Sequence, residues 1–168
     1  MALFLSLYLG HILGDFVFQP GRLVIAKRHG ARGVSLHTAI VVACTALVGA
    51  ASIAKTWPVV LLAGLAHYGV EYMTIGARRS GRSSGLTVFL LDQAMHVVSL
   101  VLLTLAFDAT IPAAVVLVEV NVETLASIAA VATVAFAGSI LVYEVELARR
   151  PEPAADADAV LRLDGPRL

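Results

Sequence analysis

Five apolar stretches of membrane-spanning length constrain this chain more than any other feature. They cover residues 2–18, 34–54, 58–75, 86–107 and 123–143. A helix needs about 20 largely apolar residues to cross the hydrocarbon core of a bilayer, where all backbone polar groups must be hydrogen-bonded within the protein. The sequence therefore predicts an all-α, polytopic transmembrane helical bundle of about five spans.

The composition supports a membrane domain. Hydrophobic residues make up 59% of the chain and charged residues 14%, with a mean hydropathy of +0.88. Soluble domains carry roughly 45–50% apolar and about 25% charged residues. We assign residues 1–147 to a transmembrane helical domain and residues 148–168, rich in Pro, Ala and Asp, to a disordered cytoplasmic tail. Residues 111–122 are compatible with a strand, a surface helix or an extension of the fifth span.

The loops differ strongly in positive charge. The second loop holds only Lys55, and the fourth holds no basic residue. Because cytoplasmic loops are enriched in Lys and Arg, the basic loops predict an N-out, C-in protein with multiple passes through the inner (cytoplasmic) membrane. Trp57 then lies at the outer interface. We expect the first apolar run to be a span and not a cleavable signal, since no basic residue precedes it. The basic residues of the other connections are Arg22, Lys27, Arg28, Arg32, Arg78, Arg79, Arg82, Arg149 and Arg150.

Three of the five stretches each carry two ionisable residues, although each such group costs about 2.5–3.5 kcal/mol at the centre of a bilayer. Within each pair the spacing is i, i+4, which places both side chains on one face of a helix. A further histidine, His37, lies near the start of the second stretch. The pairs are His11 with Asp15, His67 with Glu71, and Asp92 with His96.

The depths of these residues agree between spans. At a rise of about 1.5 Å per residue, the three carboxylates lie roughly 5–9 Å from the inner end of their spans and the three paired histidines roughly 10–15 Å. The fourth span runs opposite to the first and third, and its carboxylate precedes its histidine. The sequence therefore predicts a layer of histidines above a layer of carboxylates. His37, about 5 Å deep by the same count, belongs to the carboxylate layer.

Imidazole and carboxylate ligands together suit Zn, Mn or Fe, and helical bundles build such sites from inward-facing side chains. Three or four ligands would hold one ion, and six or seven would hold two. Gln19 and Gln93 are candidates to orient the ligands or bind substrate. The alternative is that each pair is only a hydrogen-bonded contact between helices. We expect His29 to be a solvated surface group. Glu144 and Glu146, at the inner edge of the fifth span, are expected at the surface, with the alternative that either reaches the site. The predicted metal ligands are His11, Asp15, His37, His67, Glu71, Asp92 and His96.

These motifs resemble an uncharacterised bacterial and phage integral-membrane family, one of the numbered domains of unknown function. The likeness rests on H-x3-D-x3-Q at residues 11–19, a lone His37, H-x3-E at residues 67–71 and LLDQ-x2-H at residues 90–96. It covers roughly the first 107 residues. This chain departs from the family pattern in carrying Glu71 in place of Asp, and no lysine follows closely inside that span. The resemblance implies a shared site and a membrane location, without an activity.

Three functions are compatible with such a site. The first is a metal-dependent hydrolase in which Asp15, His37 or Glu71 acts as general base. The basic loops would then hold a lipid phosphate or another anionic head group. The second is a transporter, or transport subunit, for metal ions or protons. The third is a structural or partner-binding membrane module with a polar core. We expect the lipid bilayer as partner and no nucleic acid, and no nucleotide loop, nucleophile elbow or zincin motif is present.

Overall fold

The computed structural model describes residues 2–49, 53–81, 83–107 and 122–149, and every secondary-structure element in these ranges is a helix. One short π-helical turn ends the first helical segment, and a second lies within the last long helix. The elements are α1 (Ala2–Ile12), η1 (Leu13–Val17), α2 (Gly21–His29), α3 (Ala31–Val48), α4 (Ile53–Ser80), α5 (Gly85–Phe107), α6 (Val122–Ala132), η3 (Thr133–Ala137) and α7 (Gly138–Arg149).

Four helices are long and apolar enough to cross a membrane. They are α3, most of α4, α5, and the continuous helix formed by α6, η3 and α7. A fifth candidate is the pair Ala2–Val17 and Gly21–His29, whose two helices are bent by 93°. By length and composition, the prediction of an all-α membrane protein of about five spans is confirmed.

Some expected boundaries were wrong. The α4 helix begins at Ile53, so Pro58 lies inside the helix and not at its first turn. The α3 helix runs from Ala31 to Val48, whereas residues 34–54 were expected. The first basic loop contains a helix, α2, which is polar on average and therefore has no hydropathy signal. Residues 111–121 and most of the predicted tail (150–168) lie outside the described residues.

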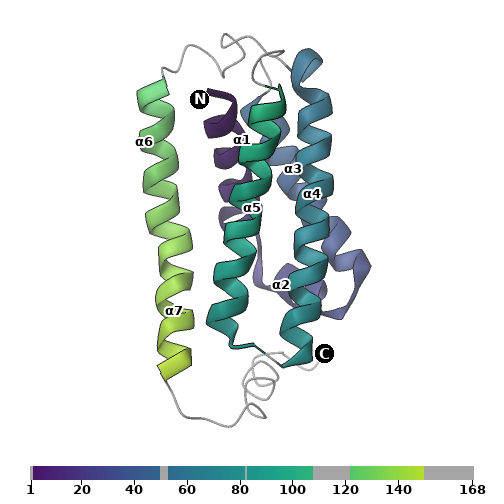
Figure 1. The fold of residues 1–168 in the computed structure, drawn as a ribbon, viewed down its shortest axis with the longest axis vertical. Coiled ribbons are helices and arrows are strands. Elements are labelled where there is room, and N and C mark those ends of the chain that lie inside the picture. Colours follow the sequence, from purple (N-terminus) through teal and green to yellow (C-terminus); the bar gives the residue numbers. More distant parts are fainter. Residues whose placement is uncertain (1, 50–52, 82, 108–121, 150–168) are drawn as a thin grey trace.

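The basic segments meet at one end of the bundle. Figure 1 shows α4 and α7 ending at the bottom of the view, with α2 in the lower half, above those ends. The Arg79 guanidinium donates a hydrogen bond to the carbonyl of Arg28 on α2, and Arg78 Nη1 lies 3.1 Å from Glu144 Oε1 on α7. We refer to this as the basic end. That it faces the cytoplasm stays a prediction.

The opposite half of the bundle has an apolar core. The α1 helix is central there and packs against α3, α5 and α6. Tyr8 on α1 also shares a 2.9 Å hydrogen bond with Thr133. This core leaves the half nearer the basic end for polar side chains. The main cluster of this apolar core comprises Leu3, Leu7, Val59, Ala63 and Leu100.

Large apolar side chains also cover the outside of the bundle. Leu47, Leu105 and Val134 are 70%, 73% and 76% exposed, respectively. Soluble monomers rarely expose extensive apolar patches, whereas lipid tails solvate them at no cost. The outward faces therefore fit contact with lipid, as expected of a multi-pass membrane protein.

Two glycines allow α1 and η1 to lie directly against α3. A Cβ atom added at Gly10 would lie 2.5 Å from Thr45 Cα, and one added at Gly14 would lie 2.6 Å from Val41 Cα. Small residues permit such close contact between membrane helices. The contact fixes the first span against the helix that carries His37, and so positions one side of the polar site.

We predict that Gly10→Ala lowers the thermal unfolding midpoint of the protein in detergent, because the new methyl group meets backbone atoms that cannot give way. Overpacking of this kind costs about 1–3 kcal/mol. Gly76→Ala is the matched control, since nothing lies within 4 Å of its added Cβ. The control should gain about 0.5–1 kcal/mol from helix propensity. Equal midpoints for the two variants would contradict the close contact of α1 with α3.

The N-out prediction can be tested by labelling in intact cells. In a Cys44→Ala background, Lys55→Cys should react with a membrane-impermeant maleimide added outside. Arg22→Cys should react only after permeabilisation, because α2 lies at the basic end. Both replaced side chains are exposed in the structure. The reverse pattern of labelling would show that the basic end faces outward.

Candidate metal centre

Three histidines from three helices form a compact group. His11 on α1, His67 on α4 and His96 on α5 are each at most 3% exposed. Their ring centroids are 4.7 Å apart for His11–His96, 4.3 Å for His67–His96 and 5.4 Å for His11–His67. One ligand atom from each lies within 4.8 Å of the others. We call this set the histidine group.

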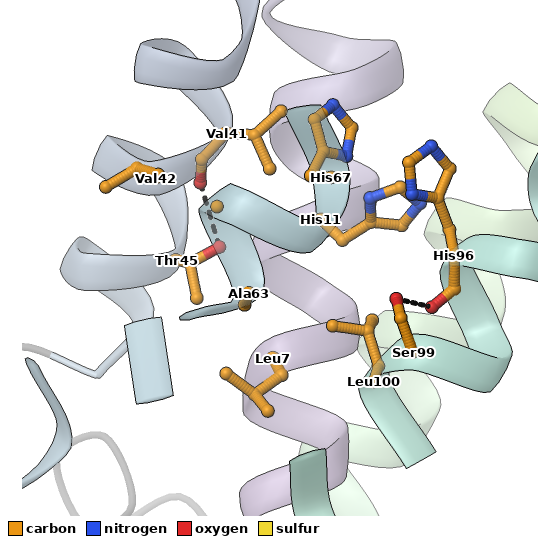
Figure 2. A pocket seen from close by; sticks show the side chains of 11 residues that line it. Leu7, His11, Val41, Val42, Thr45, Ala63, His67, His96, Ser99 and Leu100 are labelled. Atoms are coloured by element: carbon orange, nitrogen blue, oxygen red, sulfur yellow. Dashed lines mark hydrogen bonds between the residues drawn. The ribbon is translucent and has the colours of Figure 1, made fainter. Parts of the chain in front are cut away.

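A small cavity adjoins the histidine group. Its volume is about 10 Å³, and Leu7, Ala63 and Leu100 of the apolar core form part of its wall. Figure 2 shows the three imidazole rings gathered on one side of these residues. A space of about 10–15 Å³ suffices for one water-sized species. Because Leu7, Ala63 and Leu100 belong to the apolar core, the histidines lie where that core meets the polar half.

A second group of candidate ligands surrounds His37. Its Nε2 atom is 2.9 Å from Asp15 Oδ1, 3.0 Å from His67 Nε2 and 3.5 Å from Glu71 Oε1. A single ring nitrogen offers either one proton or one lone pair, so it can satisfy only part of this set. Tetrahedral metal bonds of about 2.0–2.1 Å separate neighbouring ligands by about 3.3 Å. We call Asp15, His37, His67 and Glu71 the lower group.

Asp92 completes the carboxylate layer. Thr74 donates a 2.8 Å hydrogen bond to Asp92 Oδ1, and Gln93 Nε2 donates one of 2.9 Å to Asp92 Oδ2. The same Gln93 nitrogen lies 3.5 Å from Asp15 Oδ2, so Gln93 links two carboxylates, as a residue that orients ligands would. Gln19 lines a second, larger cavity beside the carboxylates, and its Oε1 atom is buried without a hydrogen-bond partner in the described part of the chain.

Asp15 is carried by a π-helical turn. The Phe18 amide donates to the Leu13 carbonyl at 2.8 Å, a bond that closes five residues instead of four. Turns of this kind occur often at functional sites, because they change the direction of the side chains on one helical turn. This local change leaves the hydropathy pattern unaltered. The sequence therefore predicted a regular helix over residues 2–18.

Lys27 is a site residue that the sequence analysis missed. Its side chain is buried, and its Nζ atom lies 2.7 Å from Glu71 Oε1. From the sequence, Lys27 was expected to contribute to topology and to hold an anionic head group, and not to contact a candidate ligand. The family pattern places a lysine shortly after the third-span acid, and here Lys27 on α2 supplies an ammonium to that acid instead. Leu23 lies one turn before Lys27 and is also buried. This apolar residue at i−4 is the sequence signal that the Lys27 face of α2 points inward.

The pairs at i, i+4 do not satisfy each other. His11 Nε2 is 3.8 Å from Asp15 Oδ2, and His96 Nε2 is 3.7 Å from Asp92 Oδ1, both too long for hydrogen bonds. Within the described residues, several imidazole nitrogens are buried without any hydrogen-bond partner. This argues against helix packing as the only role of the pairs, since each such atom costs about 1–3 kcal/mol. These atoms are His11 Nε2, His37 Nδ1, His67 Nδ1, His96 Nδ1 and His96 Nε2.

The charges of the cluster also fit a divalent cation. Asp15, Glu71 and Asp92 face a single buried ammonium, that of Lys27. With ionised acids and neutral imidazoles, two negative charges remain uncompensated. Uncompensated charge is costly inside a bilayer. Neutral imidazole and carboxylate are the donors that Zn, Mn and Fe accept, so these residues could hold such an ion.

A larger cavity leads from the carboxylates to the basic end. Its volume is about 300 Å³, the lower end of the range for small-molecule pockets. Lys27, Arg28 and Arg78 line it together with the three carboxylates. Glu144, expected at the surface, is buried because α7 packs against α5 and Glu144 pairs with Arg78 there. The surface expectation for Glu144 was therefore wrong.

The comparisons with known proteins identify the family. The family described as "Protein of unknown function (DUF3307)" matches residues 3–135. The chain belongs to the DUF3307 family. The match extends beyond residue 107, where we had expected the likeness to end, and it includes Lys27 and every candidate ligand. No curated protein and no solved structure matches the chain.

The structure of this DUF3307 protein brings together all of the side chains that the sequence analysis selected as metal ligands. They fall into three overlapping groups: the histidine group, the lower group, and Asp15 with Glu71, Asp92 and His96. His29 stays apart, exposed, with its ring bonded to the Ile25 carbonyl at 2.8 Å. That the gathered residues bind a metal stays a prediction.

We predict that the purified DUF3307 protein contains stoichiometric Zn, Mn or Fe by elemental analysis. His67→Ala and His96→Ala should lose the metal, because each removes a member of the histidine group. His29→Ala, which alters an exposed histidine outside the cluster, should retain it. A folded wild-type protein without metal after metal-replete growth would refute the assignment.

Proposed function

We propose that this DUF3307 protein is a metal-dependent hydrolase of the membrane, with its metal held by His11, His67 and His96. The observation that carries the proposal is the set of buried imidazole nitrogens without hydrogen-bond partners, beside carboxylates that line a cavity of about 300 Å³. A bound divalent ion would supply Lewis acidity and a nucleophilic water at neutral pH. Zn, Mn and Fe all suit the donor set.

Asp15 is the best placed of the three candidate general bases. His37 is fully buried, and neither described cavity is lined by it, so its role is to hold Asp15 through their 2.9 Å hydrogen bond. Glu71 lines the large cavity but is bound to the Lys27 ammonium. Asp15 lines the cavity and can accept a proton from a reacting group there.

The cavity suggests an anionic, membrane-associated substrate. Arg28 and Arg78 line it near the basic end, and guanidinium groups bind phosphate well. Phe16, Phe89 and Tyr143 supply apolar and aromatic walls that suit the non-polar part of a lipid. We therefore propose a phosphorylated amphiphile, whose head group enters from the basic end and whose phosphoester bond is hydrolysed.

A transporter is less well supported. Such a path needs polar groups across the whole membrane, and the half away from the basic end offers chiefly hydroxyls. Those of Thr45, Ser99 and Thr104 each donate at 2.8 Å to a carbonyl of their own helix. They are thus already engaged and poorly suited to coordinate a passing ion. Ser6 Oγ is buried without a hydrogen-bond partner among the described residues, and Ser52 lies outside them.

We predict metal-dependent release of inorganic phosphate when the protein, reconstituted in liposomes, is given phosphorylated lipids of varied head group. Chelation should abolish the release. Asp15→Asn should lower kcat by about 10²–10⁴, the usual contribution of a general base. Glu146→Gln, which changes an exposed acid on α7, should leave kcat unaltered.

Two results would count against the hydrolase. One is flux of Zn or Mn through the proteoliposomes without phosphate release, which would favour a transporter. The other is the absence of phosphate release with every lipid from protein shown to contain its metal, which would leave a binding or structural role.

A further inference from the structure

The candidate ligands provide enough donors for two ions. The histidine group and the lower group share only His67. If His67 serves the histidine group, the lower group still offers Asp15, His37 and Glu71, and three protein ligands are enough for a catalytic metal. Two-metal hydrolases, with ions about 3.5–4 Å apart, are a common solution. Whether this centre holds one ion or two therefore depends on what else occupies the lower group.

The two groups differ in how their atoms are satisfied. In the histidine group, His11 Nε2 and both ring nitrogens of His96 have no hydrogen-bond partner among the described residues. In the lower group, Glu71 Oε1 accepts a 2.7 Å hydrogen bond from the Lys27 ammonium, and Asp15 Oδ1 lies 2.9 Å from His37 Nε2. A positive charge is thus already present among the oxygen ligands of the lower group.

Lys27 is held in this position by its neighbours in sequence. Ala26 packs against Gly33, where an added Cβ would clash with the Ala26 carbonyl. The next residue, Arg28, accepts a hydrogen bond at its carbonyl from Arg79 on α4. Leu23, one turn before Lys27, is buried on the same face. The backbone on both sides of Lys27 is therefore fixed, and its ammonium is a built-in part of the site.

We infer that the Lys27 ammonium takes the place of a second metal ion in the lower group, so that the protein binds one ion, at the histidine group. This inference rests on the metal centre of the proposed function. An ammonium in contact with Glu71 repels a divalent cation that would use the same carboxylate, and it offsets part of the negative charge that would attract one. The substrate then meets one metal ion and one ammonium from the protein.

The test is the number of zinc ions per chain, measured by elemental analysis after loading with excess Zn²⁺ and desalting. The wild type should hold one ion. Lys27→Met should hold two, because it frees Glu71 and removes the repelling charge. Arg22→Met is the matched control: it removes one charge from an exposed position of the same helix and should hold one. The double variant Lys27→Met/Glu71→Gln should again hold one zinc ion per chain, because it removes the carboxylate that Lys27→Met frees.

The outcomes separate this inference from the proposed function. Two ions in the wild type, or one in a folded Lys27→Met variant, would overturn the inference and leave the metal centre intact. No zinc in either folded protein would refute the metal centre itself. Lys27→Gln keeps a hydrogen-bond donor for Glu71 and provides the same measurement if the methionine variant aggregates. Thermal unfolding midpoints in detergent show which variants are folded.

Discussion

The cost of placing polar groups in hydrocarbon is the constraint on which this structure depends. Each ionisable side chain is expensive within a bilayer unless other polar groups surround it. Four helices, α1 with its π turn, α3, α4 and α5, bring their costly residues to one place, and their remaining surfaces are left to lipid or to the apolar core. Gly10 and Gly14 make this possible, because they let the first span lie against α3.

The sequence predicted the spans and the two layers because both follow from regular helix geometry. A rise of about 1.5 Å per residue fixes the relative depth of His67 and Glu71, or of Asp92 and His96, without knowledge of the neighbouring helices. The face on which each pair lies follows from the i, i+4 spacing in the same way. Such features are set within one helix, so the sequence alone can predict them.

The features that the sequence did not reveal depend on contacts between elements. Lys27 is buried because α2 is bent by 93° from the preceding helix and packs on α3. The polar sequence of this nine-residue helix does not predict that packing. Glu144 is buried only because α7 packs against α5 and because Arg78 of α4 pairs with Glu144 there. The π turn at Asp15 changes one hydrogen bond and leaves the hydropathy unchanged. In each case the deciding interaction joins residues distant in sequence or alters the backbone locally.

The position of the large cavity has a consequence for metal supply. The cavity joins the carboxylates to the basic end. The described part of the other half holds apolar side chains and a few hydroxyls, among them Thr45 and Thr104, which are bonded to their own helices. An ion reaching the cluster by this route comes from the compartment at the basic end. Sites of imidazole and carboxylate bind several first-row metals in a common order of strength, and cells select among these metals by availability. The identity of the bound ion would then reflect the metal pool of that compartment as much as the ligands themselves.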